Sequence, residues 1–399
     1  MATVGVLAGI DTADERPVRL PDRLGLLACL AGGLGTSLLP LLVFKANRIA
    51  AGDPLRVTAA LPPVTATILL LVLAAAGLVV LFVRNPVVRL AAAVTGLVAL
   101  TLAVGHGATT LVADGERYAR VALGGAFWVL LVTLALLVTD AMARLRFGPL
   151  ARIAALAITA AAVAALFASG SWNDLSVMRE YASRSTTFWR EAERHVLLSV
   201  GSLAAAALVG LPLGVLAHRR PRLRAAMLQT LNLIQTIPSI ALFGILMAPL
   251  GYLAANVPLA AALGIRGIGV APALLALFLY ALLPVVANTV IGLGQVAPAV
   301  VDAARGMGLT DRQILTRIEL PLAFPVILTG IRIVLVQSIG LVTVAALIGG
   351  GGFGTFVFQG IGQTAMDLVL LGAIPTVALA FAAAVLLDAA VDFSRRGTP

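Results

Sequence analysis

Long, nearly uncharged apolar runs recur along this chain, and they restrict the folds that it can adopt more than any other feature. Most of the runs extend for about 20 residues, the length that an α-helix needs to cross the hydrocarbon core of a bilayer. Only 12% of the 399 residues are charged, and the mean hydropathy is +1.05, whereas soluble domains carry about 25% charged residues. The sequence therefore predicts an all-α polytopic membrane protein with about ten transmembrane helices.

The runs form two groups separated by a polar interval. Before the interval we expect spans at Leu24–Phe44, Val64–Val83, Leu90–Gly105, Val121–Thr139 and Pro149–Ala168. After it we expect spans at Val196–Ala217, Ala226–Tyr252, Val270–Leu293, Leu322–Ile348 and Met366–Ala390. The interval, residues 169–195, mixes charges with aromatic side chains, which is typical of an interfacial segment. We therefore predict an accessory N-terminal region over residues 1–168, an extracytoplasmic interfacial segment over 169–195 and a membrane core over 196–399.

The distribution of positive charge predicts the orientation of these spans. Arginines are more frequent in the loops on the side of the N-terminus, and loops of this kind remain in the cytoplasm. Both termini and residues 302–321 are therefore expected in the cytoplasm. The polar lead at residues 11–23 precedes an apolar run without a small-residue cleavage site, so we expect that run to be a span and not a cleaved signal. Because the net charge of +10 is spread over many short loops, the expected partner is the lipid bilayer and not nucleic acid.

A charged stretch, residues 298–321, separates two of the long apolar runs. Pro298 is suited to the first turn of a helix, and Gly308 falls where a left-handed C-terminal cap is expected. Thr310 has a glutamine three residues later, which is the spacing of a capping box, and the second helix is expected to end at Pro321. We predict two short cytoplasmic helices joined at a glycine corner. An amphipathic helix pair that merely lies on the bilayer has the same composition.

Two predicted spans contain a proline next to polar side chains. Proline removes a helical hydrogen bond and clashes with the preceding turn, and in lipid such a break is stable only where it faces protein or a water-filled cavity. A gate in a translocation path and a plain packing kink both account for these breaks. The residues concerned are Gln235, Thr236, Pro238, Ser239, Pro284, Asn288 and Thr289.

Arg332 lies inside a predicted span. At about 1.5 Å per residue it is about 16 Å beyond Pro321, near the expected bilayer midplane. An arginine at that depth costs about 2.5–3.5 kcal/mol on insertion scales and must face the bundle interior or a cavity. Two interpretations remain open for it: a residue that lines a pathway, or a structural tie to helix-end carbonyls.

The glycine-rich run Gly349–Gly354 follows a membrane helix and not a strand, so it is not a nucleotide-binding fingerprint, and we expect a tight external turn. No phosphate-binding loop of the form GxxxxGK[ST] occurs in the chain. We predict no catalytic residue, no metal site and no cofactor. If ATP drives this protein, another chain binds it.

The charged stretch resembles the coupling signature of binding-protein-dependent ABC importer permeases, which reads Glu-Ala-Ala, three residues, Gly, nine residues, Ile-x-Leu-Pro. This chain matches every position except the first, where Asp302 replaces glutamate. The resemblance implies that this stretch contacts an ATPase subunit. The implied coupling residues are Asp302, Ala303, Ala304, Arg305, Gly308, Ile318, Leu320 and Pro321.

Further segments of the second half are similar to the osmoprotectant branch of these permeases. They are Gln235–Ser239, Leu279–Pro284, Ala303–Gly308, Glu319–Ala323, Gly330–Arg332 and Ala345–Gly354. The resemblance implies a type I importer fold in the bacterial cytoplasmic (inner) membrane. It also implies two ABC ATPase subunits, an extracytoplasmic solute-binding protein and a second permease subunit, either a second copy or a paralogue. The implied cargo is a quaternary ammonium solute such as glycine betaine.

Two alternatives to this function remain. A permease of the same kind for an amino acid or another betaine has the same coupling signature. An ion-coupled secondary transporter would require acidic residues within the spans, and the acidic residues Asp140, Asp367, Asp388 and Asp392 are expected at or near the ends of spans.

Overall fold

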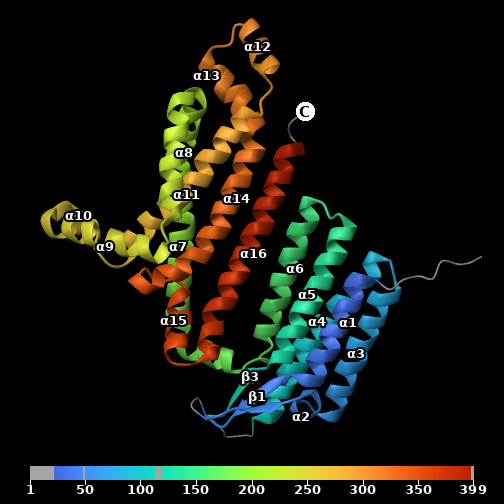
Figure 1. Ribbon diagram of the computed structural model, residues 1–399. Helices are drawn as coiled ribbons and strands as arrows, with labels where there is room; N and C mark the ends of the chain where they lie inside the picture. The colour runs from blue at the N-terminus through green and yellow to red at the C-terminus, as the bar shows by residue number, and fades with distance from the viewer. Residues whose placement is uncertain (1–21, 48–49, 113–117, 397–399) are drawn as a thin grey trace, which may run out of the picture. The chain divides into compact units, whose positions relative to one another are not determined.

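The computed structural model describes residues 22–47, 50–112 and 118–396 (Figure 1). Residues 11–21 of the expected polar lead lie outside this range. Within the described residues, nine helices are long and apolar enough to cross a membrane, and the helix Arg23–Leu38 is apolar but shorter. The chain divides into two compact units. The first comprises residues 1–43, 53–111 and 123–146, and the second comprises 44–52, 112–122 and 147–399.

The first unit is a bundle of apolar helices. Its members are α1 (Arg23–Leu38), α2 (Val57–Ala60), α3 (Pro63–Phe82), α4 (Pro86–Leu111) and α5 (Gly125–Leu145). Helix α4 packs against both α3 and α5, and α1 packs against α5. Pro63 and Pro86 begin their helices, where a missing N–H leaves no partner unsatisfied. At the crossing of α4 and α5, Gly96 allows close approach, because a Cβ there would lie 2.9 Å from Leu134.

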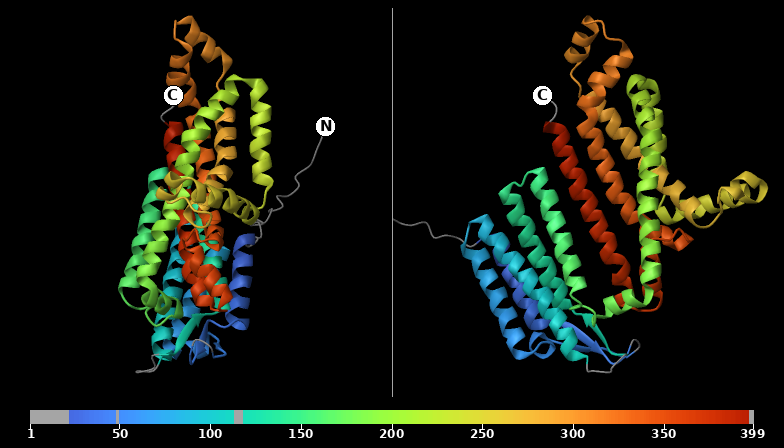
Figure 2. Two further views of the ribbon diagram at one scale, coloured as in Figure 1. Left: turned by 90° about the vertical axis from the view of Figure 1, so that its left-hand side faces the viewer. Right: turned by 180° about the vertical axis from the view of Figure 1, so that it is seen from behind.

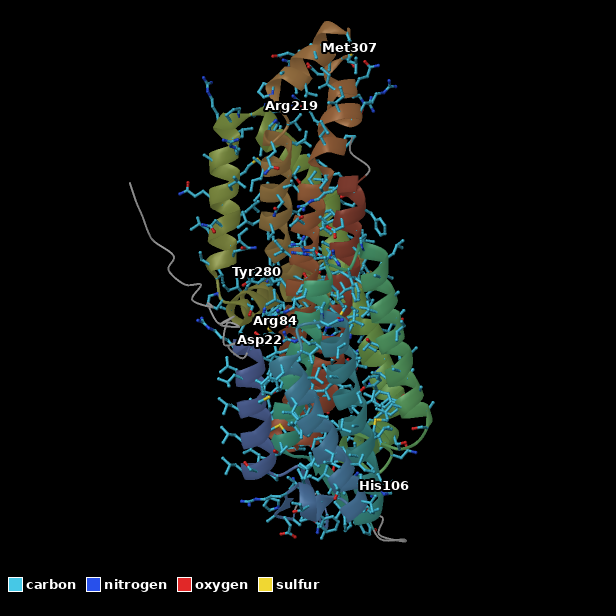
Figure 3. All side chains as sticks on the ribbon, turned by 90° about the vertical axis from the view of Figure 1, so that its right-hand side faces the viewer. Asp22, Arg84, His106, Arg219, Tyr280 and Met307 are labelled. Carbon is cyan, nitrogen blue, oxygen red and sulfur yellow. The ribbon has the colours of Figure 1, made fainter. Side chains whose placement is uncertain are left out.

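An ionic cluster joins one end of the helices of the first unit. Asp22 precedes α1 (Figure 3) and pairs with Arg89 of α4 and, at 3.4 Å, with Arg144 of α5. Arg144 also bonds Asp140 at 2.8 Å. Partial burial acts to raise the pKa of the Asp22 carboxyl, but its bond to Arg89 and the positive charges of Arg89 and Arg144 hold that pKa below its usual value.

A three-stranded sheet, absent from the sequence prediction, has the order β2-β1-β3. Its strands are β1 (Leu42–Lys45), β2 (Asp53–Leu55) and β3 (Arg120–Leu123). The expected helices Leu24–Phe44 and Val121–Thr139 are therefore wrong at these ends. Proline disfavours a helical residue before it, and Pro40 follows α1 closely. Before α5, the N–H of Gly124 donates to Leu41 at 2.8 Å, and a Cβ on Gly124 would lie 2.2 Å from the Pro40 oxygen.

The second unit contains the remaining helices, which Figure 2 shows in two further views. The long ones are α6 (Pro149–Ala168), α7 (Ser176–Arg219), α8 (Pro221–Thr236), α9 (Ser239–Asn256), α11 (Val270–Gly294), α14 (Leu320–Ala345) and α16 (Met366–Arg396). The short ones are α10 (Pro258–Ala262), α12 (Pro298–Gly306), α13 (Asp311–Ile314), the π-helix η1 (Leu315–Glu319), the 3₁₀ helix η2 (Ala346–Ile348) and α15 (Gly354–Gly362). Helix α11 packs against α7 and α14, α14 packs against α16, and α6 packs against α16. The core of this arrangement includes Leu198, Phe243, Leu277 and Val342.

Two of the expected spans in this unit differ from the helices observed. Most of the polar interval 169–195 joins the following span in the single helix α7, which has a kink at Arg184 (φ −134°, ψ 19°). The expected span Ala226–Tyr252 is instead two helices, α8 and α9, because the backbone is extended at Ile237 before Pro238. Helices α9 and α10 extend away from the other helices of the unit (Figures 1 and 2).

Candidate functional site: a helical corner and two helix breaks

Local capping signals build the corner between α12 and α13, as predicted. Pro298 is in the first turn of α12, and Gly308 has φ +81°, the left-handed region that glycine adopts without strain. The N–H of Thr310 donates to the Gln313 side chain at 2.9 Å, and the Gln313 N–H donates back to the Thr310 hydroxyl at 3.4 Å. The predicted capping box is therefore confirmed. These short-range bonds satisfy backbone groups at the turn and so fix the conformation of the corner.

One face of the corner is buried and the opposite face is exposed to solvent. Ala304 and Ile314 are fully enclosed, whereas Met307 is 71% exposed at the tip of the corner (Figure 3). Arg305 lies 3.5 Å from Asp302 and 3.9 Å from Asp311, and all three side chains are more than half exposed. Exposed pairs of this kind contribute about 0–1 kcal/mol. The corner therefore depends on packing and caps, and its charged groups remain available to a partner.

The predicted end of the second corner helix at Pro321 is wrong. Helix α13 continues through η1 into α14, and the N–H of Leu320 donates five residues back to Leu315. This π-helical turn changes the hydrogen-bond register directly before the proline, where an ordinary helix would lack a donor. Pro321 is then accommodated in the first turn of α14. The second helix of the corner and the membrane helix are consequently one continuous rod.

An ion pair with a buried carboxylate ties this rod to α7. Glu319 is 3% exposed, and its carboxylate accepts a hydrogen bond from Arg219, in the last turn of α7 (Figure 3). A cation at this end of a helix also interacts favourably with the helix dipole. Glu319 occupies the unspecified position of the Ile-x-Leu-Pro pattern, so the pattern did not single it out. Leu320 packs inward beside Leu293.

The two proline breaks are joined by reciprocal hydrogen bonds. Pro284 has no N–H, so the carbonyl of Tyr280, four residues earlier in α11, lacks a helical donor. The Gln235 side chain donates to that carbonyl at 2.6 Å. In return, the Tyr280 hydroxyl donates to the carbonyl of Ile237, next to Pro238 in the α8–α9 break. Each break thus satisfies a backbone group that the other leaves open. Tyr280 did not stand out in the sequence as a site residue.

The other polar residues near the breaks bond mainly within their own helices. Asn288 donates to a carbonyl four residues back at 2.8 Å, Thr289 does so at 2.7 Å, and Thr236 bonds three residues back at 2.7 Å. A Cβ on Gly330 of α14 would lie 2.6 Å from the Cβ of Asn288, and a Cβ on Gly214 of α7 would lie 2.5 Å from the Cβ of Thr289. Asn288 and Thr289 therefore occupy tight helix crossings. Ser239 begins α9.

Arg332 pairs with Asp388 of α16 and not with helix-end carbonyls. Asp388 also accepts from Arg152, in the first turn of α6. The carboxylate of Asp388 therefore connects α6, α14 and α16. The expected position of Arg332 near the bilayer midplane stays a prediction.

The predicted tight turn at Gly349–Gly354 is confirmed, and α7 anchors it. Gly349, Gly351 and Gly352 have φ between +78° and +83°. The N–H of Gly352 donates to Glu191 at 2.8 Å, and the N–H of Phe353 donates to His195 at 3.2 Å. The other ring nitrogen of His195 lies 3.0 Å from the carbonyl of Ile339 in α14. Glu191 and His195 are buried, and no spacing in the sequence linked them to the turn.

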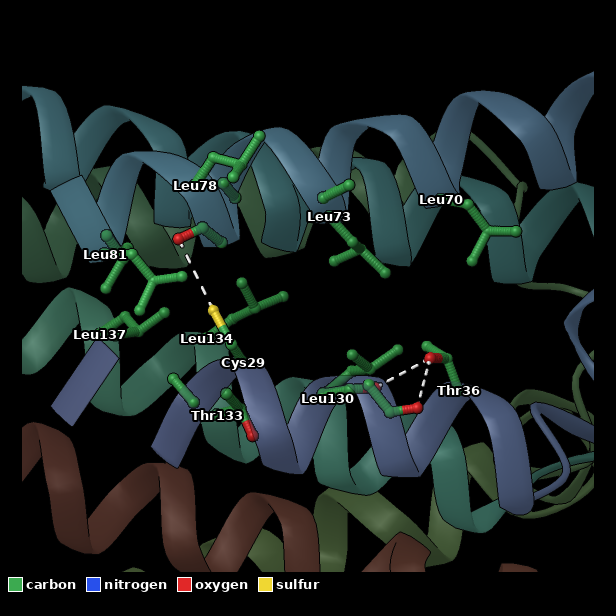
Figure 4. A pocket seen from close by; sticks show the side chains of 17 residues that line it. Cys29, Thr36, Leu70, Leu73, Leu78, Leu81, Leu130, Thr133, Leu134 and Leu137 are labelled. Carbon is green, nitrogen blue, oxygen red and sulfur yellow. Dashed lines mark hydrogen bonds between the residues drawn. The ribbon is translucent and has the colours of Figure 1, made fainter. Parts of the chain in front are cut away.

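A separate apolar cavity of about 450 Å³ lies in the first unit (Figure 4). Helices α1, α3 and α5 line it with small and aliphatic residues, among them Cys29, Leu73 and Leu134. The Cys29 thiol is 3.6 Å from the Gly77 carbonyl, and the Thr36 hydroxyl bonds carbonyls of its own helix. The polar side-chain atoms in its lining are limited to the Cys29 thiol and the hydroxyls of Thr36 and Thr133, so the cavity is poorly suited to a hydrophilic solute.

Comparisons with known proteins assign the family. Residues 206–398 match the model of the binding-protein-dependent transport system inner membrane component. The carnitine transport permease protein OpuCD of Listeria monocytogenes is 37% identical over 208 residues, which are 52% of this chain and 86% of that protein. This chain belongs to the binding-protein-dependent ABC importer permeases. The predicted family and fold class are confirmed, and the protein is a multi-pass inner membrane transport component.

Other relatives match a similar share of this chain. The glycine betaine/carnitine/choline permease OpuCD of Bacillus subtilis is 36% identical, covering 50% of this chain and 81% of that protein. The osmoprotectant import permease OsmW of Salmonella typhimurium is 40% identical, covering 45% of this chain and 79% of that protein. Residues 22–178 match the N-terminal domain of the ABC transporter permease YehY. Among solved structures, the inward-facing MetNI methionine ABC transporter aligns with 54% of this chain and 98% of that chain, at 22% identity and TM-score 0.46.

Proposed function

We propose that this permease carries a quaternary ammonium compatible solute, such as glycine betaine, into the cell. The observation that supports this most directly is the set of relatives at 35–40% identity, whose names specify carnitine, choline, glycine betaine or osmoprotectants. An aromatic cage is the usual site for a quaternary ammonium group. No such cage stands out among the described spans, so we assign substrate selection chiefly to an extracytoplasmic binding protein.

The proposed assembly has two ATPase subunits, one solute-binding protein and a second permease subunit, either another copy or a paralogue. Both termini and the corner lie in the cytoplasm. The corner inserts Met307 and Ala303, with the charges of Asp302 and Arg305, into a groove of the ATPase, which hydrolyses ATP. Exposed apolar atoms rimmed by charge are the surface that a protein partner covers. Because α13, η1 and α14 form one rod, movement of the ATPase is transmitted directly to the membrane.

We assign the gate to the two proline breaks. The Gln235–Tyr280 and Tyr280–Ile237 hydrogen bonds hold α8, α9 and α11 together at their weakest turns. Two side-chain bonds of about 1 kcal/mol each are strong enough to define one state and weak enough to break on each cycle. In this proposal Gln235, Thr236, Pro238, Ser239, Pro284, Asn288, Thr289 and Arg332 line or shape the path. Since Asp388 balances the charge of Arg332, this arginine presents no bare positive charge to a cationic solute.

The test is uptake of radiolabelled glycine betaine by proteoliposomes containing this chain, its ATPase and its binding protein, with and without internal ATP. The matched variants are Gly308→Arg at the corner and Gly264→Arg between α10 and α11. Both glycines have positive φ (+81° and +76°) and free space around them, so the local strain is similar. The proposal predicts ATP-dependent uptake, together with loss of ATPase association in Gly308→Arg alone.

The outcomes separate substrate from mechanism. Solute-stimulated ATPase activity with an amino acid, and none with betaines, would discard the substrate and keep the coupling. Equal ATPase association in both glycine variants would discard the coupling site. Uptake that is indifferent to ATP would contradict the proposed energy source.

A further inference from the structure

Helix α6 has little apolar contact with the helix that it accompanies. It packs against α16, yet Pro149 is its single buried residue among those described. In a bilayer, lipid tails are as apolar as leucine, so apolar contact between helices provides no hydrophobic driving force, and polar bonds and close packing decide the association. The position of α6 on α16 must therefore depend strongly on its polar contacts.

Arg152 provides those contacts. Its guanidinium donates to Asp388, to Asp392 at 2.6 Å and to the carbonyl of Phe147 at 3.0 Å. The two aspartates are four residues apart in α16 and so lie on one face of that helix. A planar guanidinium with several donors is suited to bridging two carboxylates in this way, whereas an ammonium group is not.

The same carboxylate serves two helices. One oxygen of Asp388 accepts from Arg152 of α6, and the other oxygen accepts from Arg332 of α14. Two arginines and two aspartates thus form a connected group, the four-residue cluster, whose formal charges sum to zero. Each side chain in the cluster is 30–39% exposed in the isolated chain, and α6, α14 and α16 are all apolar membrane helices. Loss of one member leaves an unbalanced charge beside lipid, which is costly.

We propose that α6 is a working part of the permease core, and that Arg152 is a positioning residue for Arg332. Helix α6 lies within the residues that match the YehY N-terminal domain and before those that match the permease core. Its charge nevertheless completes the counter-ion system of the core helix α14. The functional boundary between the accessory N-terminal region and the core then falls before Pro149, and α6 fixes the orientation of α14 through Asp388.

The test is thermal unfolding of the purified full chain in detergent or nanodiscs, which requires no substrate and so is independent of the proposed cargo. The variants are Arg152→Gln, Asp392→Asn, the double variant Arg152→Gln/Asp392→Asn and Arg152→Lys. Arg84→Gln, at an exposed arginine between α3 and α4, is the matched control for loss of a positive charge. Each single neutralisation is expected to lower the Tm by about 5 °C or more.

Charge balance predicts a result for the double variant that independent destabilisation by each substitution does not. The double variant restores neutrality and keeps the Arg332–Asp388 pair, so it is expected to recover at least half of the Tm lost in Arg152→Gln. Arg152→Lys keeps the positive charge but lacks the planar guanidinium. Its Tm is therefore expected to lie between those of the wild type and Arg152→Gln. A double variant whose loss equals or exceeds the sum of the single losses would overturn the proposal. A Tm of Arg152→Gln equal to that of Arg84→Gln would overturn it as well.

Discussion

The side chain of Gln235 lies 2.6 Å from the carbonyl oxygen of Tyr280, the backbone group that Pro284 deprives of its helical donor. The hydroxyl of the same tyrosine reaches back to Ile237, beside the second proline break. Two prolines that would each weaken a membrane helix are therefore compensated by side chains of the partner helix. This is how non-helical backbone is tolerated within a membrane protein.

Removing the tyrosine hydroxyl tests that relationship. Tyr280→Phe leaves the Ile237 carbonyl without its donor and is expected to cost about 1–3 kcal/mol of unfolding free energy. It is also expected to change the transport rate, because the break is then less well held. Thr376→Val is the matched control, since the Thr376 hydroxyl of α16 bonds a carbonyl of its own helix and lies outside the proposed gate. Equal stability and transport in the two variants would show that the bond does not hold the break.

The ion pair between the buried Glu319 and Arg219 predicts a measurable loss of stability from a single substitution. Glu319→Gln leaves Arg219 without its carboxylate and is expected to destabilise the chain by about 1.5–3 kcal/mol, because the Arg219 side chain is 34% exposed and water partly solvates its charge. Asp302→Asn breaks an exposed pair and is expected to change stability by less than about 1 kcal/mol. Denaturant unfolding of the purified chain measures both. A smaller loss for Glu319→Gln than for Asp302→Asn would contradict the assignment of this pair as the tie between α7 and α14.

The glycine-rich turn predicts a sharp contrast between two glycine-to-alanine substitutions. At Gly352, with φ +83°, a Cβ would lie 3.0 Å from His195, so alanine is expected to cost at least about 1–2 kcal/mol from backbone strain alone. At Gly362, which ends α15 with open space around it, alanine is expected to be neutral or slightly stabilising. Unfolding measurements on the two variants compare the same chemical change at a strained and an unstrained site.

The Asp22 cluster predicts a dependence of stability on pH in the first unit. Because the pKa of Asp22 is lowered in the folded state, its ionised form adds stability at neutral pH. That contribution is complete above the unfolded pKa of about 3.9 and is lost as the pH falls through the lower folded value. The stability difference between wild type and Asp22→Asn is therefore expected to be constant from pH 7 to about pH 5 and to shrink below about pH 4. A difference that grows on acidification would give the opposite sign and refute the ion pair.

Local chemistry made the corner predictable from the amino-acid sequence. Pro298, Gly308 and the Thr310–Gln313 capping box act over three or four residues, so their geometry follows from the order of residues alone. The apolar runs likewise determined that the chain crosses a membrane, because a span depends on length and composition. The coupling pattern indicated the family because all of its defining residues lie within one short stretch.

Only the tertiary structure decided the partners of the charged and polar groups. Arg152 and Asp388 are 236 residues apart, Arg219 and Glu319 are 100 apart, and Gln235 and Tyr280 are 45 apart. Helical periodicity says which face a residue occupies but not which helix lies opposite. The sheet depended on pairing between distant strands, and the passage of α14 through Pro321 depended on a π-helical turn whose hydrogen bonds no residue pattern specified. These features depend on contacts between segments that are distant in the sequence, and the order of residues within one segment does not specify such contacts.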